Sequence, residues 1–66
     1  MTWEELSVEQ MGRVRHHKDS SVNGLIIILT KVDRTEILAK VMQPRGMWKV
    51  GDELSLVPDN FDPNIL

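Results

Sequence analysis

The side chains most able to do chemistry lie in one short stretch around two adjacent histidines. His16 and His17 are neighbours, so on an extended strand they point to opposite faces and cannot act as a base with its orienting partner. Ser20 and Ser21 follow, but the sequence indicates neither an activating base nor an oxyanion hole for them. Cysteine and tyrosine are both absent, which removes a thiolate nucleophile and a phenolic acid. We therefore expect a protein that is not an enzyme.

Metal and phosphate ligands are equally sparse. His16 and Asp19 would offer two ligands with i, i+3 spacing on a helix, which is too few for a zinc site. A Gly-rich phosphate loop is missing as well, because Asn23-Gly24 and Arg45-Gly46 are isolated turn signals. We expect no metal site and no cofactor.

A basic stretch offers a way to bind nucleic acid, with Trp48 available to stack on a base. It consists of Arg13, Arg15, His16, His17 and Lys18. The formal net charge is −2, so the overall charge does not favour nucleic acid. The same stretch is also typical of an edge strand with solubilising charges. Nucleic acid is therefore possible but a weaker prediction than a protein partner.

The turn at residues 44–48 carries residue types that are enriched at the energetic centres of protein interfaces. Arg45, Met47 and Trp48 are our candidate partner-binding residues for this reason. The structural alternative places Trp48 in the core beside Val50 and Leu54. The predicted function is that of a small protein-interaction module, an accessory or regulatory subunit of a larger assembly.

A run of five aliphatic residues, Leu25 to Leu29, has no polar side. Alternate residues of a strand point to opposite faces, so both faces of this strand need cover. A 66-residue chain without cysteine has little material for that purpose. The run therefore predicts a curled sheet, a covering helix or a second subunit, and makes a homo-oligomer possible.

The remaining patterns predict short strands joined by tight turns. A capping box at Thr2 and Glu5 predicts a helix over 2–10, with Ser7 and Gln10 as a second cap. We expect strands over 11–18, 25–32, 35–42 and 53–57, with helix as the competing interpretation of 11–18 and 35–42. Asn23-Gly24 favours a type I′ turn, Asp33-Arg34 a hairpin, and Phe61 should fold back onto the core.

These elements add up to a mostly β protein with one short N-terminal helix. The most economical architecture is a small closed or half-closed barrel of four to five short antiparallel strands. We expect a helical segment over 1–10, the barrel over 11–58 and a turn and tail over 59–66. A dimer with exchanged strands is the nearest alternative.

The segment from Leu38 to Pro58, with Val50-Gly51-Asp52-Glu53 before an apolar strand, resembles the closing part of small barrels of the TOBE or KOW type. This resemblance implies a small SH3-like or OB-like barrel of four to five short antiparallel strands. It also implies two alternatives to protein binding, a KOW-like nucleic-acid module and a TOBE-like oxyanion-binding module. The Ser-Ala-Arg-Asn-like oxyanion motif is missing here, so that role is not carried over to particular residues.

Composition also bears on location. Residues 1–10 carry three glutamates and no basic residue, which is the wrong charge for a secretory signal. No apolar stretch is long enough to span a membrane, and the absence of cysteine is compatible with a reducing compartment. We expect a cytoplasmic protein without a membrane partner.

Overall fold

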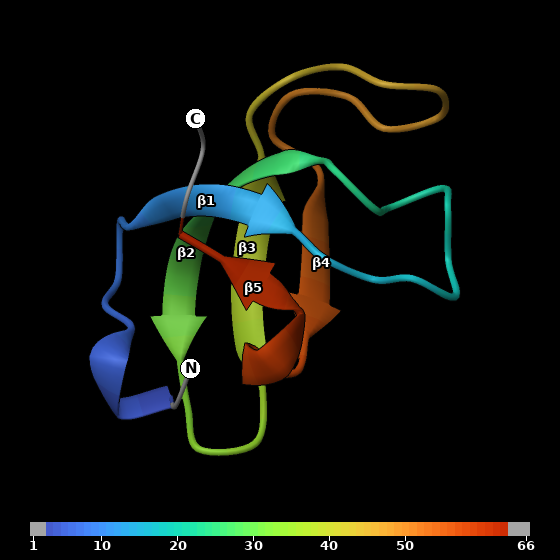
Figure 1. Cartoon of the computed structure of the whole chain (residues 1–66). Coiled ribbons are helices and arrows are strands. Elements are labelled where there is room, and N and C mark those ends of the chain that lie inside the picture. Colours follow the sequence, from blue (N-terminus) through green and yellow to red (C-terminus); the bar gives the residue numbers. More distant parts are fainter. Residues whose placement is uncertain (1–2, 64–66) are drawn as a thin grey trace.

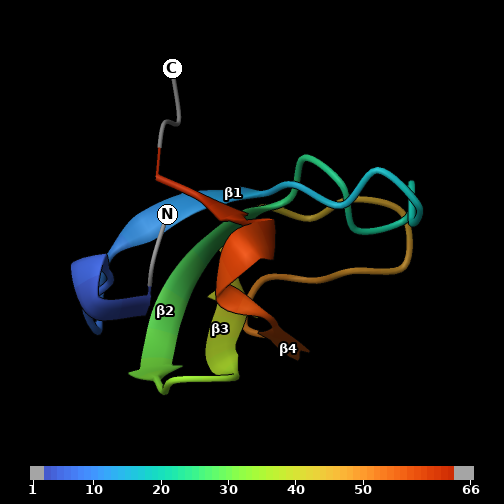
Figure 2. The same ribbon diagram turned by 60° about the horizontal axis from the view of Figure 1, so that its bottom comes forward.

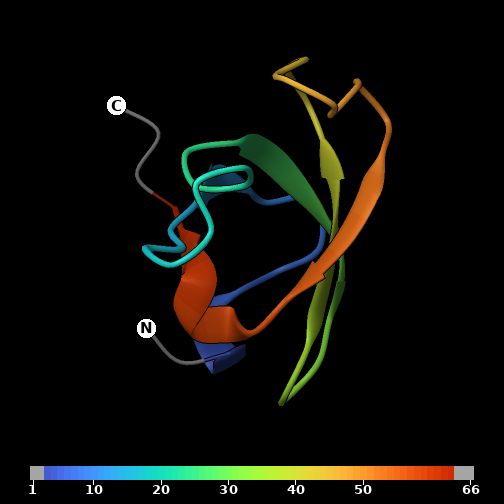
Figure 3. The ribbon, with the colours of Figure 1, turned by 90° about the vertical axis from the view of Figure 1, so that its right-hand side faces the viewer.

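A single antiparallel sheet, curled into a half-barrel, forms most of the protein in the computed structural model, which describes residues 3–63 (Figures 1 and 3). Its strands are β1 (Met11–Val14), β2 (Ile26–Val32), β3 (Ile37–Val41), β4 (Glu53–Leu56) and β5 (Phe61–Asp62). They lie in the order β4-β3-β2-β1-β5. The prediction of a mostly β protein is confirmed, and the segment around 37–41 is a strand rather than a helix.

The concave side of the sheet holds the core. Within the aliphatic run, Leu25, Ile27 and Leu29 are fully buried on this side, while Ile26 and Ile28 are half-buried on the other. β3 contributes Ile37, Ala39 and Val41, each 0 % exposed. The curl of the sheet therefore covers one face of the run completely and leaves the other partly open.

A β-bulge in β2 helps to bend the sheet. Leu29 pairs with Ala39 and Lys31 pairs with Leu38, so Thr30 is an extra residue without a partner on β3. A bulge of this kind bends its strand and increases the local twist. The bend lets the two ends of the sheet approach each other, as a half-barrel requires.

β1 alternates between exposed and buried positions, and its buried glycine receives the ring of Phe61. Gly12 and Val14 point inward, while Met11 and Arg13 point outward. Phe61 is 3 % exposed, which confirms that it folds back onto the core. Together with Asp62 it forms β5, which pairs with β1, so the expected C-terminal turn and tail adds a fifth strand to the sheet.

β1 ends four residues earlier than the expected strand over 11–18. The ladder to β2 runs as far as Val14, which exchanges hydrogen bonds with Leu25 and Gly24. At His16 the backbone N–H instead donates to the side-chain Oδ1 of Asn23, at 2.9 Å. A side chain thus replaces the next backbone partner, and the chain leaves the sheet.

The turn at Asn23-Gly24 differs from the expected type I′ turn. Leu25 N–H donates to the carbonyl of Val22, and only Gly24, with φ +89°, has a positive φ. One positive φ at the third position defines a type II turn. The hydrogen bond from His16 uses the Asn23 side chain and holds that residue in the ordinary φ region.

The helix expected over 2–10 is not formed, and only a single 3-10 turn, η1 (Trp3–Glu5), is present. The predicted cap residue Thr2 lies outside the described residues. Ser7 and Gln10 do interact, since Ser7 N–H donates to Oε1 of Gln10, but they close a β-turn. The Glu9 N–H donates to the carbonyl of Leu29, and this tertiary bond favours the turn over the helix. Within residues 3–63, no helix is long and apolar enough to cross a membrane.

Replacing Glu9 with glycine is expected to raise the free energy of unfolding. Glu9 has φ +71°, in the left-handed region where a Cβ costs about 1 kcal/mol or more. Glycine removes that cost, so the stabilisation should be about 1 kcal/mol in urea unfolding. Glu9→Ala is the matched control, because it removes the carboxylate and keeps the Cβ. A glycine variant no more stable than the alanine variant would contradict the strain argument.

Candidate functional site

Two long loops project from the same end of the sheet. The first loop, residues 15–25, joins β1 to β2, and the second loop, residues 42–52, joins β3 to β4 (Figures 1 and 2). In an antiparallel meander, connections that follow alternate strands lie at the same end. The topology therefore brings the basic stretch and the Met47-Trp48 turn, distant in sequence, to one end of the molecule.

The tip of the second loop is a two-residue hairpin. Arg45 and Trp48 exchange backbone hydrogen bonds of 2.9 and 2.8 Å around Gly46 and Met47. Gly46 has φ +55° and Met47 does not have a positive φ, which defines a type II′ turn. The Met47 side chain is 94 % exposed, whereas Trp48 is half-buried and packs against the core. The hairpin therefore places an anchored indole next to a fully exposed thioether.

Arg45 ties the second loop to the first. Its Nη1 donates to the carbonyl of Asn23, and its Nη2 donates to the carbonyl of Ser20 at 3.3 Å. A guanidinium carries five N–H donors in a rigid fork, so it can hold two carbonyls together and keep further donors available. Arg45 was predicted as a partner-binding residue, and the structure also gives it a positioning role.

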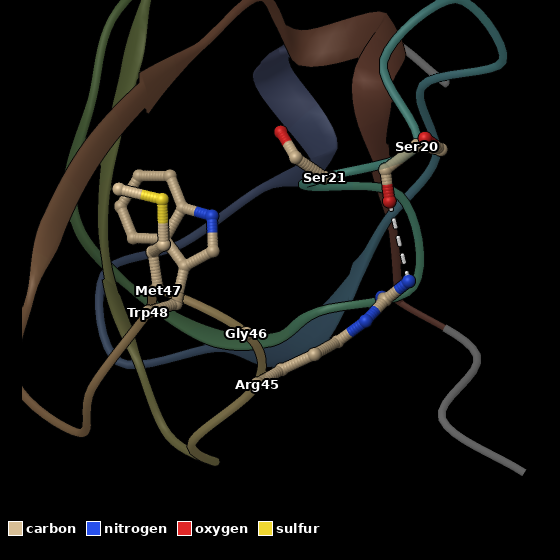
Figure 4. Close-up of a pocket in the computed structure, with 6 residues that line it drawn as sticks. All are labelled: Ser20, Ser21, Arg45, Gly46, Met47 and Trp48. Carbon is tan, nitrogen blue, oxygen red and sulfur yellow. Dashed lines mark hydrogen bonds between the residues drawn. The ribbon is translucent and has the colours of Figure 1, made fainter.

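A pocket of about 560 Å³ opens between the two loops (Figure 4). It is lined by Ser20, Ser21, Arg45, Gly46, Met47 and Trp48. Met47 and Trp48 stand on one side of the opening and the two serines on the other. All three predicted partner-binding residues therefore meet at one pocket. Sequence reasoning considered Ser20 and Ser21 only as nucleophiles, because nothing in the local sequence indicates that Arg45 contacts their loop.

Asp19 fixes the side of the pocket that is lined by Ser20 and Ser21. Ser21 donates to the same Asp19 Oδ1 twice, from Oγ at 2.5 Å and from its backbone N–H at 3.1 Å. The hydrogen bond from the Ser21 hydroxyl, followed by that from its backbone N–H, lowers the pKa of Asp19, because both favour the carboxylate. The first loop is therefore built around a charged Asp19 that turns the chain toward the pocket.

The structure does not gather the five residues of the basic stretch on one face. Arg15 forms an ion pair with Asp62, and Arg13 lies opposite Asp62 in the sheet. His16 lines a different, smaller pocket of about 270 Å³ with residues of η2 (Pro58–Asn60) and β4. His17 and Lys18 are exposed in the first loop. The carboxylate of Asp62 thus offsets part of the positive charge that the sequence suggested.

The titratable side chains that the structure describes do not gather into a metal centre. Across residues 3–63, no group of three or more histidine, cysteine or acidic side chains lies close enough to hold a metal ion. The pocket between the loops contains one charged residue, Arg45, and no histidine. Its lining combines one cation, one aromatic ring and one flexible thioether.

No family model matches the chain, and no curated protein or solved structure matches it either.

Proposed function

We propose that this protein is a small, non-enzymatic protein-interaction module, an accessory or regulatory subunit that binds its partner at the pocket between the two loops. The observation that carries the proposal is the convergence of Arg45, Met47 and Trp48 on that pocket, with Met47 94 % exposed. Arginine, methionine and tryptophan are enriched at protein interfaces, and arginine and tryptophan are also enriched among hot spots.

The energetics of the pocket support this role. An exposed methionine gains about 1.5–3 kcal/mol when a partner buries it completely. Trp48 is already packed against the core, and its hairpin is closed by two backbone hydrogen bonds. An anchor that is fixed before binding loses little conformational entropy when the complex forms.

The strand arrangement supports an SH3-like architecture for the module. The sheet is a meander from β1 to β4, after which η2 leads into β5 on the far side of β1. A five-stranded meander that closes back onto its first strand is the arrangement expected of small SH3-like barrels, which often recognise ligands with their loops. The pocket between the loops is compatible with that mode of binding.

Capture from the source cells tests the proposal. We expect one or more proteins to co-purify with the tagged wild-type chain and to be lost with Met47→Ser, whose exposed side chain has no packing role in the fold. Trp48→Ala should weaken binding about thirty-fold, the effect of losing a hot spot of about 2 kcal/mol. Val8→Ser is the matched control, because Val8 is 56 % exposed on the N-terminal turn. Equal capture by all variants would contradict the proposal.

Nucleic-acid binding through the basic stretch is the second candidate, favoured by the exposure of Arg13, His17 and Lys18. Because Asp62 pairs with Arg15, we expect only weak binding of oligonucleotides at low salt. Neutralising few phosphates gives a shallow dependence on salt concentration. A steep salt dependence in fluorescence titrations would instead favour this candidate.

A further inference from the structure

Two polar groups at the pocket between the loops, the Arg45 guanidinium and the Trp48 indole N–H, can donate hydrogen bonds but cannot accept them. A guanidinium has no acceptor, and an indole nitrogen has none either. Two nitrogens of Arg45 hold the carbonyls of Asn23 and Ser20, and each of these nitrogens carries a second hydrogen. None of the residues 3–63 accepts a hydrogen bond from the indole N–H of Trp48.

The charge of the pocket has one sign. Among its lining residues Arg45 is the single charged side chain, and none is acidic. Asp19 and Asp52 are the nearest acids in sequence, but neither lines the pocket, and their carboxylates accept hydrogen bonds from Ser21 and from the Lys49 N–H. The side chain of Lys49, adjacent to Trp48, is exposed and adds a second positive charge nearby. A ligand that enters the pocket therefore meets positive charge and unused donors.

Apolar surface lines the same pocket as these donors. In Figure 4 the Met47 thioether and the Trp48 ring stand together, across the opening from the point where Arg45 reaches Ser20. An unbranched thioether adapts to the shape of what packs on it, and an indole face accepts aromatic or aliphatic side chains. A matching ligand needs a large apolar side chain and an acceptor-rich, negatively charged group next to it.

We propose that the pocket between the loops recognises a peptide segment of a partner protein in which a large apolar side chain is followed by a carboxylate. The apolar side chain packs on Met47 and Trp48, and the carboxylate accepts hydrogen bonds from Arg45. This inference rests on the proposed function and adds the chemistry of the partner. The carboxylate belongs to an Asp or Glu side chain or to the C-terminus of the partner chain.

Two-dimensional NMR of the full ¹⁵N-labelled chain tests this chemistry with defined probes. The acidic probe is acetyl-Leu-Phe-Asp-Glu-amide, and its neutral match is acetyl-Leu-Phe-Asn-Gln-amide. Acetyl-Leu-Phe with a free carboxylate represents a C-terminus, and acetyl-Gly-Ala-Asp-Glu-amide removes the large apolar side chains. The readout is the indole N–H cross-peak of Trp48, identified by its loss in Trp48→Phe.

We expect either carboxylate-bearing Leu-Phe probe to shift this cross-peak with about two- to five-fold higher affinity than the neutral probe, the effect of one exposed ion pair. Which of the two binds more tightly identifies the source of the carboxylate. The Gly-Ala probe should not bind measurably. Equal affinities for the acidic and neutral probes, or no shift with any probe at millimolar concentration, would overturn the inference. The proposed function would then still be decided by the capture experiment with Met47→Ser.

Discussion

Replacing Gly12 with alanine is expected to destabilise the protein by about 3 kcal/mol or more, because overpacking a core position forces its neighbours to move. A Cβ at this position would lie 2.4 Å from Cζ of Phe61 and 2.5 Å from the carbonyl oxygen of Asp62. The carbonyl belongs to the backbone of β5 and cannot rotate away. The variant should therefore lose the pairing between β1 and β5, and a domain of this size has about 3–10 kcal/mol of stability in total.

Urea unfolding of Gly12→Ala and Gly51→Ala separates crowding from backbone strain. Gly51 has φ +93°, and no atom lies within 4 Å of the place that a Cβ would take, so its alanine variant reports only the left-handed backbone, at about 1 kcal/mol. Adding Phe61→Leu to Gly12→Ala should recover part of the loss, because the ring atoms are removed and the carbonyl stays. A Gly12→Ala variant as stable as wild type would contradict the packing of Phe61 on β1.

Replacing Ile27 with alanine is expected to lower the free energy of unfolding by about 2–5 kcal/mol, the range for large-to-small changes in a buried core. Ile27 is 0 % exposed on the concave side of the sheet. Ile28 is the matched control, because it is the same residue type on the same strand and is half-buried on the opposite face. Ile28→Ala should lower the free energy of unfolding of the monomer by about 1 kcal/mol, because it removes less buried apolar surface than Ile27→Ala does.

The pair of isoleucine variants also tests the predicted homo-oligomer. Ile28 pairs with Met11 on β1, and Met11 is 41 % exposed, so the outer face carries apolar side chains that a second copy would cover. If a second subunit covered this face, Ile28→Ala would cost as much as Ile27→Ala, and the unfolding midpoint would rise with protein concentration. Unequal costs with a midpoint that does not depend on concentration would contradict the homo-oligomer.

The strands were predictable because their signals are local. Leu25 to Val32 is rich in β-branched residues, and Asp33-Arg34 is too short a connection for anything but a hairpin partner. The alternation of Ile37, Ala39 and Val41 could be distinguished from helical spacing only with that hairpin in view. Neighbouring residues therefore supplied most of the information needed for the sheet.

The N-terminal helix failed as a prediction because one local pattern fits two structures. Ser7 and Gln10 interact through the hydrogen bond that a capping box would use, yet they close a turn. The deciding contact is the hydrogen bond from the Glu9 N–H to the carbonyl of Leu29, which lies on β2. No short-range pattern encodes such a contact, and the same holds for the crowding of Gly12 by Phe61.

The sequence predicted three residues of the candidate site by their types, but it did not predict which other loop would line the pocket. Arg45, Met47 and Trp48 stood out by type and by their turn. Arg45 donates hydrogen bonds to the carbonyls of Ser20 and Asn23 because two loops meet at one end of the sheet, and no local pattern encodes that meeting. Likewise, the offset of the basic stretch by Asp62 became visible only when β5 was placed beside β1.

Photo-crosslinking from the tip of the second loop tests the central claim most directly. A photoreactive benzoyl-phenylalanine replaces Met47 in one variant and Val8, which is 56 % exposed on the N-terminal turn, in another. Both variants are irradiated in the source cells. A partner that binds at the pocket between the loops should crosslink from position 47 and not from position 8. Crosslinking to a partner from position 8 alone would contradict the assignment of this pocket as the binding site.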